Sequence, residues 1–338
     1  MIKVTHQFFT ISYYLHREAG PGGSILRIYD IGTKDSELRD IPETLPPDGI
    51  FVTCSVTEAR ELAAAFGWEE NTVKKCFDPT GTVQYIACDG YDFVSLIHME
   101  TAGEKTVKRI ISMFFSKQYF VLVLPEQKGG GLDELTEDLC RFIEDSETKA
   151  NGVEQLYYLT LSWLAAAYSN MLEKLEDDME TLSEAVAIDS RKRQINEISR
   201  LRKLSYKNKK ILRAISYVSE EIREDENNLI GKEQVKHFRV VSTRFKKLYD
   251  FAESLYELSG EILNIYDSNM ALKMNESIDK LSAIMMFLAA ITVITGIFNM
   301  DFRFLPEIDS IVGYPLAMGV IALVCFILYR SLRKQNWK

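Results

Sequence analysis

Charged and apolar positions are segregated along the chain, most clearly near its C-terminus. Residues 281–300 and 310–329 form two stretches of about 20 residues without a charged side chain. A helix of this length can cross the hydrocarbon layer of a bilayer, which is about 30 Å thick. We therefore expect two membrane-spanning helices joined by the short segment 301–309, which together make a helical hairpin.

The charges beside these stretches predict their orientation. The connecting segment holds three carboxylates and one basic residue, Arg303. Six basic residues flank the two stretches on the sides away from the connecting segment: Lys273, Lys280, Arg330, Arg333, Lys334 and Lys338. Because basic residues concentrate on the cytosolic side, we expect both termini in the cytosol and the hairpin in the cell (inner) membrane. The N-terminal sequence lacks the pattern of a signal peptide, which agrees with that orientation.

The first 150 residues have a mixed α/β pattern. Runs rich in β-branched or alternating apolar residues predict strands at 24–31, 50–56, 83–99 and 109–124. Helical periodicity is found at 57–66 and 132–144. We expect one cytosolic α/β domain, which ends near residues 129–131 or at the helix just after them.

From about residue 153 the pattern is helical almost without interruption. No proline occurs between Pro125 and Pro306, and the sequence predicts helices at 153–187, 190–224 and 232–300. The predicted fold class is α+β. Its parts are a cytosolic α/β domain (1–150), long helices and a stalk (151–280), a transmembrane hairpin (281–300 and 310–329, within 281–329) and a basic cytosolic tail (330–338).

The third helix carries a seven-residue repeat of mainly large apolar residues. The row is Phe238, Val241, Phe245, Leu248, Ala252, Leu255, Ser259, Ile262 and Tyr266. Such a repeat requires a helical partner. Two interpretations are open: the row is buried against other helices of its own domain, or it packs against other copies in a self-associated stalk. The length of the helix below the membrane, ~70 Å, favours the stalk for part of the row.

Small and polar residues gather on one row of the first span. Steps of three and four give Asn275, Ile278, Ser282, Met285, Ala289, Thr292 and Gly296. Small residues at this spacing often permit close helix packing. The alternative is a water-filled path lined by hydroxyl groups and an amide. One hairpin cannot enclose a pore, so this path would lie on the axis of a ring of subunits.

Composition excludes several function classes. The formal net charge of −9 argues against nucleic acid as a main partner, because binding phosphates requires a basic surface. The five cysteines form no CxxC pair, and the four histidines form no HExxH pair, so neither a thiolate zinc site nor a hydrolytic centre is predicted. No nucleotide-binding loop is present. We expect no enzyme activity and no cofactor, and the acidic net charge favours cations as the ligand.

Sequence motifs now point to a family. Residues 296–302 read Gly-Ile-Phe-Asn-Met-Asp-Phe, residues 305–308 read Leu-Pro-Glu-Ile and residues 313–315 read Gly-Tyr-Pro. Their order and spacing, together with the two-span C-terminus, resemble the CorA family of divalent-cation channels, and the resemblance covers nearly the whole chain. It implies a homopentamer in the lipid bilayer, a stalk helix continuing into the pore-lining span, and passive uptake of magnesium or a similar dication.

The resemblance also has two departures. The family signature is Gly-Met-Asn, whereas this chain has Asn299-Met300-Asp301, so Asp301 stands where the family's asparagine is understood to bind the hydrated ion. In some members a carboxylate pair between subunits senses cytosolic magnesium; Lys75 and Asn264 occupy those positions here and cannot serve as anionic ligands. We expect Asp301, Asn299 and Asn275 to contact the ion.

Two function classes follow from these features. The first is a divalent-cation channel or transporter, with magnesium as the default ion and zinc, cobalt or nickel as alternatives. The second is a non-conducting membrane scaffold or sensor that has kept the fold. A pore that had lost its function should have filled with large apolar side chains, and Ser282, Thr292 and Gly296 have not changed in this way, which favours conduction.

Overall fold

The computed structural model describes most of the chain. The described residues are 26–32, 37–38, 41–42, 44–77, 81–102, 105–125, 131–145, 152–298 and 313–334. They fall into two compact units, one formed by Met1–Glu184 with Arg193–Ile262 and the other by Ala185–Lys192 with Leu263–Lys338. Each unit is described here by itself.

The first unit contains a seven-stranded sheet with the order β2-β1-β3-β7-β6-β5-β4. Its strands are β1 (Arg27–Asp30), β2 (Glu37–Leu38), β3 (Ile50–Ser55), β4 (Gln84–Cys88), β5 (Tyr91–Ala102), β6 (Lys105–Phe115) and β7 (Tyr119–Leu124). Strands β3 and β7 pair in parallel, and the other neighbours pair antiparallel. Both β3 and β7 are buried along their whole length, which is typical of central strands covered on two faces.

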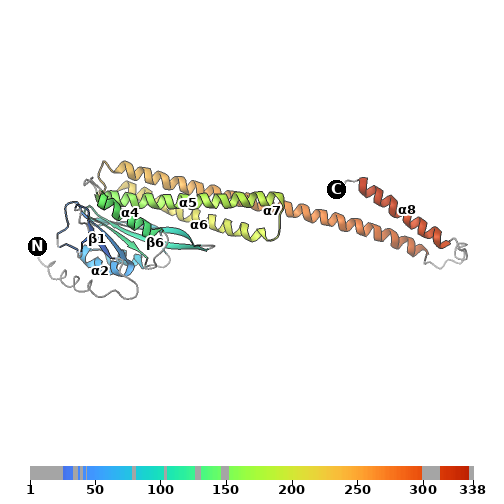
Figure 1. Cartoon of the computed structure of the whole chain (residues 1–338), viewed down its shortest axis with the longest axis horizontal. Helices are drawn as coiled ribbons and strands as arrows, with labels where there is room; N and C mark the ends of the chain where they lie inside the picture. The colour runs from blue at the N-terminus through green and yellow to red at the C-terminus, as the bar shows by residue number, and fades with distance from the viewer. Residues whose placement is uncertain are drawn as a thin grey trace. The chain divides into compact units, whose positions relative to one another are not determined.

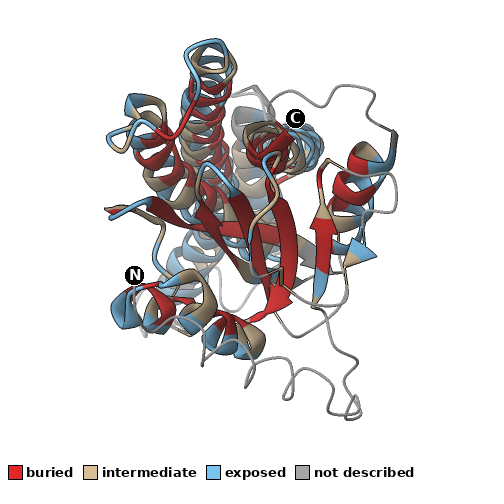
Figure 2. Cartoon of the chain, turned by 90° about the vertical axis from the view of Figure 1, so that its left-hand side faces the viewer, coloured by how far each residue is buried: buried red, intermediate tan, exposed pale blue. Residues whose placement is uncertain are grey.

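Helices cover both faces of this sheet, as Figure 2 shows by the buried strands between them. On one face lie α2 (Val56–Phe66) and α3 (Glu70–Cys76), where the Trp68 ring stacks on Phe114 at 3.7 Å. On the other face α5 (Gly152–Ile188) contributes Tyr157, whose ring stacks on Phe115 at 4.6 Å. The predicted mixed α/β domain is therefore present.

Two hairpins divide runs that the sequence predicted as single strands. The run 83–99 contains β4, a turn at Asp89-Gly90 and β5, and the run 109–124 contains the end of β6, a turn and β7. Gly90 has a φ of +79°, a conformation that glycine adopts without strain. The flanking strands are apolar up to these turns, so the pattern of apolar residues did not show where one strand ends and the next begins.

Helix α2 shows how local sequence defines an element. The Ser55 hydroxyl accepts a hydrogen bond from the Glu58 backbone N–H, and the Glu58 carboxylate accepts one from the Ser55 N–H at 2.7 Å. This capping box satisfies two N–H groups at the start of the helix. Gly67, with a φ of +69°, ends it in a left-handed conformation.

The long helices agree closely with their predicted ranges. They are α5 (Gly152–Ile188), α6 (Gln194–Glu224) and α7 (Val235–Phe298), and the shorter helices α4 (Leu132–Asp145) and α8 (Gly313–Lys334) complete the chain. In the first unit α5 and α6 run beside the first half of α7 (Figure 1). The Tyr157 and Phe238 rings lie 5.4 Å apart, and the Ser219 hydroxyl donates to the Ser242 hydroxyl at 3.4 Å.

The seven-residue repeat of α7 is buried within its own chain. All nine members of the row from Phe238 to Tyr266 are buried, and Phe245 and Ala252 have no exposed surface. The stalk interpretation of this row is therefore wrong, because α5 and α6 of the same protomer cover it. The repeat carries no information about self-association.

Candidate functional site

The predicted small and polar row lies on an uncovered face of α7. All seven of its members, from Asn275 to Gly296, are exposed, and its two large side chains, Ile278 and Met285, are 51% and 55% exposed. The row belongs to the second unit, and it lies on the 64-residue helix α7, which runs from Val235 to Phe298 without a break. The structure thus brings the seven residues together along one line.

The opposite face of the same stretch is partly covered. Ala283 is 7% exposed, and at 100° per residue it lies roughly opposite the row. The positions of intermediate exposure on α7 share the side of Ala283: Phe287, Ala290, Ile291 and Ile294. Those of α8 also share one face: Ile321, Val324, Cys325 and Leu328. This is the pattern of two helices of a hairpin that meet along one side, and in Figure 1 α8 turns back beside α7.

Hydroxyl groups on this stretch have a defined orientation. The Thr292 hydroxyl donates its hydrogen to the Leu288 carbonyl oxygen at 2.8 Å. Its oxygen therefore keeps lone pairs that can accept a hydrogen bond from a passing water molecule. The Thr295 hydroxyl makes the equivalent bond to the Ile291 carbonyl oxygen at 2.9 Å, but Thr295 is not part of the row. One helical turn thus offers two similar threonines on different faces.

The residues predicted for the outer mouth, Asn299 and Asp301, lie outside the described residues. Asn275, predicted to contact the ion, is exposed at the N-terminal end of the row. Of the positions connected with control, Lys75 is half-buried on α3 and Asn264 is exposed on α7. Among the described residues no group of three or more His, Cys, Asp or Glu side chains is arranged to hold a metal ion.

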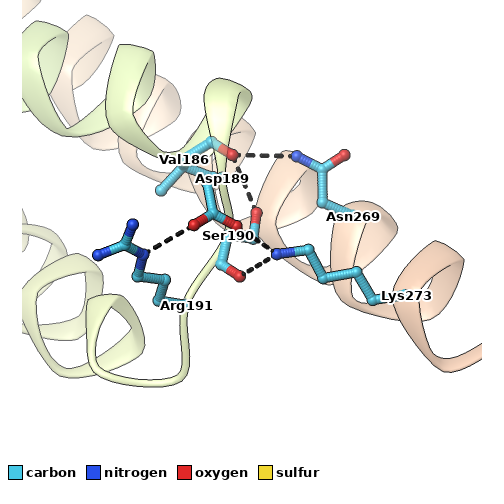
Figure 3. Close-up of polar contacts among 6 residues, drawn as sticks. All are labelled: Val186, Asp189, Ser190, Arg191, Asn269 and Lys273. Atoms are coloured by element: carbon cyan, nitrogen blue, oxygen red, sulfur yellow. Dashed lines mark hydrogen bonds and ion pairs between the residues drawn. The ribbon is translucent and has the colours of Figure 1, made fainter. Parts of the chain in front are cut away.

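The loop between α5 and α6 is attached to α7 just before the row begins. The Lys273 ammonium donates to the Asp189 carboxylate at 2.5 Å and to the Ser190 carbonyl oxygen at 2.8 Å (Figure 3). The Asn269 side chain donates to the Val186 carbonyl oxygen at 3.1 Å. Hydrogen bonds from Lys273 and Arg191 lower the pKa of Asp189 to about 2. In the sequence Lys273 indicates only the orientation of the predicted span, and no local pattern predicts its contact with Asp189.

A second polar network was also missed. Asp92, 2% exposed on β5, accepts a hydrogen bond from the Asn227 side chain at 2.7 Å, and the same amide donates to the Cys88 carbonyl oxygen at 2.8 Å. Asn227 belongs to the turn between α6 and α7, so the network attaches that turn to the sheet. Burial raises the pKa of Asp92 to about 6. In the sequence, the signal for Asp92 is a carboxylate between the apolar residues Tyr91 and Phe93.

Hydropathy agrees with a membrane location for the upper part of α7. Within the described part of the chain, the helix Val235–Gly296 is the one long and apolar enough to cross a bilayer, with a mean hydropathy of 1.8 over its most apolar window. Only 6% of that window is buried, whereas the core helix of a soluble protein would be mostly buried. The apolar part of α8 with described side chains, Met318–Arg330, is shorter.

Several characterised proteins are similar in sequence. The "Cobalt/magnesium transport protein CorA" of Thermotoga maritima is 26% identical over 67% of this chain and 64% of its own length. The protein of the same name from Methanocaldococcus jannaschii is 25% identical over 55% of this chain and 59% of its own length. The match to this chain thus covers less than two thirds of the length of either relative. The "Magnesium transport protein CorA" of Bacillus subtilis, 20% identical, matches over 88% of its length.

Solved structures show the same fold. "The complete structure of CorA magnesium transporter from Methanocaldococcus jannaschii" has a TM-score of 0.81 at 19% identity and covers 93% of this chain and 99% of its own. The "structure of the full-length CmaX protein" has a TM-score of 0.71 at 13% identity, over 95% and 100% of the two chains. A family model described as "CorA-like Mg2+ transporter protein" matches residues 50–334, and the chain therefore belongs to the CorA family.

Proposed function

We propose that the protein is one subunit of a homopentameric channel that admits divalent cations, with magnesium as its main ion. The observation that carries this proposal is the exposed row from Asn275 to Gly296, on the side of α7 opposite the side that faces α8. A row that is uncovered in the protomer is free to face the axis of a ring. Family membership supports transport as the activity.

The row suits a hydrated dication. Magnesium gives up its water slowly and is best held through its water shell, whose hydrogens need acceptor oxygens. Thr292 offers such an oxygen because its own hydrogen is bonded to the Leu288 carbonyl, and the amide of Asn275 offers another at the cytosolic end. The other members of the row, from Ile278 to Gly296, have side chains of different size, so the width of the proposed path would vary along the helix.

The ring of Asp301 residues is the proposed filter at the outer mouth. Aspartate is nearly isosteric with asparagine and supplies two acceptor oxygens, so it can bind the water shell of magnesium. A ring of five carboxylates would also concentrate dications at the mouth. Carboxylates can ligate zinc or cobalt directly as well, which makes these ions the alternative cargo. Asn299 takes the place of glycine because asparagine tolerates a left-handed backbone.

The membrane potential is sufficient as the energy source. A dication that moves through 100 mV gains roughly 4.6 kcal/mol, which corresponds to accumulation on the order of a thousandfold. In the proposed orientation both termini are cytosolic, the basic residues after α8 stay inside, and the bilayer is the second partner of the chain. The non-conducting scaffold is the competing function, and the altered Asn-Met-Asp signature is the feature that favours it.

Ion flux tests the proposal directly. Liposomes that carry the purified protein should take up magnesium, and zinc, cobalt and nickel should be offered in competition. Asp301→Ala should abolish uptake, whereas Asp301→Asn should keep magnesium uptake and weaken any preference for zinc or cobalt. Asn299→Ala should do less harm, and Asn299→Gly should restore what alanine removes if the backbone is left-handed.

Two results would overturn the proposal. Equal uptake by the wild type and Asp301→Ala for all four ions would mean that this ring is not the filter. A monomeric or dimeric mass in mild detergent, measured by light scattering with correction for detergent, would exclude a pore on a five-fold axis, because one hairpin cannot enclose a path. No flux from a pentamer would support the scaffold.

A further inference from the structure

The loop between α5 and α6 combines one exposed apolar residue with a run of basic residues. Ile188, the last residue of α5, is 86% exposed, far more than the other large apolar side chains in the described part of α5. Asp189 and Ser190 follow, and then Arg191, Lys192 and Arg193, all three of which are exposed. An apolar side chain beside several cations is the composition of segments that lie at a membrane surface.

The acidic residue of this loop is already neutralised. The Asp189 carboxylate accepts a hydrogen bond from Lys273 at 2.5 Å and one from Arg191 at 2.7 Å (Figure 3). An anionic surface near the loop would therefore meet little repulsion from Asp189. Lys192 and Arg193 then give the loop a positive charge, and the neighbouring exposed charges on α7 are Glu276, Asp279 and Lys280.

The contact with Lys273 sets the position of the loop along α7. Lys273 lies eight residues before Leu281, where the uncharged stretch begins. At 1.5 Å per residue this separation is about 12 Å. The headgroup layer extends roughly 5–7 Å beyond the hydrocarbon on each side. The gap between the loop and the headgroups is thus within the reach of extended lysine and arginine side chains.

We propose that the α5–α6 loop binds anionic phospholipid headgroups in the leaflet at which α7 enters the membrane. Lys192 and Arg193 contact the lipid phosphates, and Ile188 lies next to them, just outside the headgroup layer. The inference rests on the proposed function in one respect, namely that α7 crosses a bilayer. A second copy of the loop is a poorer occupant, since identical basic runs repel each other.

A fluorescent label on the loop can test this contact in the full-length protein. The variant Ile188→Cys would be labelled in a Cys325→Ser background, since Cys54, Cys76, Cys88 and Cys140 are buried. The protein is placed in nanodiscs of phosphatidylcholine alone or with phosphatidylglycerol, and a headgroup-attached spin label serves as quencher. We expect quenching in the anionic discs and clearly less in the neutral discs. Ser254→Cys, exposed on α7 far below the span, is the matched label position and should show none.

Charge reversal tests the proposed cations. Lys192→Glu with Arg193→Glu should remove the quenching at position 188, because each cation near an anionic surface changes the docking equilibrium about fivefold. Lys246→Glu with Lys247→Glu reverses two exposed neighbouring lysines on α7 and is the control, which should leave quenching unchanged.

The outcomes separate this inference from the channel proposal. Absence of quenching, or quenching that ignores both lipid charge and the Lys192 and Arg193 reversal, would overturn the lipid contact. A change of oligomeric mass in the reversal variant would instead identify the loop as an interface between copies and would also overturn it. Magnesium uptake by the same labelled protein in liposomes is measured in parallel, so that loss of uptake with intact quenching counts against the channel alone.

Discussion

The two halves of α7 carry the same spacing of threes and fours but have opposite environments. In the lower half the row from Phe238 to Tyr266 is buried by helices of its own chain, whereas in the upper half the row from Asn275 to Gly296 is exposed throughout. The lower row consists mainly of large apolar residues, with Ala252 and Ser259 as exceptions, and the upper row mostly of small and polar ones. Periodicity therefore identifies a face, and the size and polarity of its side chains differ between the face that the chain itself covers and the face that it leaves exposed.

Blocking the upper row should give the largest effect. Thr292→Phe should abolish magnesium uptake into liposomes, because a ring of five phenylalanines would fill the proposed path. Thr295→Phe is the matched control: it changes a similarly exposed threonine whose hydroxyl also bonds to the carbonyl four residues earlier, but on another face. We expect this control to retain uptake. If both variants transport equally well, the upper row does not line a path.

Truncating the lower row should chiefly affect stability. Phe245, with no exposed surface, packs inside the first unit, so Phe245→Ala should lower the free energy of unfolding by about 3–5 kcal/mol. Val240 is 46% exposed on the same helix, and Val240→Ala should remain within about 0.5 kcal/mol of the wild type. Denaturant unfolding in detergent measures both. Similar small losses would mean that the chain itself does not bury the lower row.

The attachment of the turn before α7 should make stability depend on pH. The pKa of Asp92 is about 6 in the folded protein because of burial, and it returns to the ordinary range of about 3.9 on unfolding. The folded state therefore binds the proton more tightly, so this group's contribution to stability rises as pH falls from 7 to 4 and is lost above 6. In Asp92→Asn, the change in the free energy of unfolding between pH 7 and pH 4 should be smaller by about 1–3 kcal/mol.

Unfolding of the wild type and Asp92→Asn at several pH values measures this difference. Asp225 and Glu154, whose pKa values are also raised by burial, remain in both proteins, so they cancel in the comparison. Glu100→Gln on the same strand, which is paired with Arg109 at 2.6 Å, is the control for a general charge effect. Parallel pH profiles of wild type and Asp92→Asn would rule out Asp92 as the origin.

The smallest expected effect concerns the loop at the border between the two halves. Lys273→Met removes an exposed ion pair, so global unfolding should not change measurably. Amide hydrogen exchange of residues 186–192 should nevertheless become faster, because the loop loses the two hydrogen bonds from Lys273 and keeps only the one from Asn269. Lys280→Met, also exposed on α7, should leave this exchange unchanged. Equal exchange in both variants would show that the Lys273 contact does not hold the loop.

The sequence predicted elements far better than their partners. The three long helices, the sheet domain and the family all followed from periodicity and motifs. The short helix Glu70–Cys76 and the turn at Asp89-Gly90 did not, because seven residues give little periodicity and the strands around the turn are apolar on both faces.

The site shows the same limit. The row from Asn275 to Gly296 could be read from spacing, since all its members lie on one helix. The bonds from Lys273 to Asp189 and from Asn227 to Asp92 join residues 84 and 135 positions apart, and no local pattern indicates such pairs. The partner of the lower row could not be predicted either, because a heptad repeat does not distinguish a helix of the same chain from a helix of another copy.

The bonds at the end of α5 also bear on the order of events during synthesis. The Val186 carbonyl oxygen accepts a hydrogen bond from Ser190, four residues later, at 2.9 Å, and another from Asn269, 83 residues later, at 3.1 Å. The first bond can form as soon as α5 leaves the ribosome. The second must wait until the ribosome has nearly reached the first uncharged stretch, so the end of α5 is completed only as the nascent chain becomes ready for insertion into the membrane.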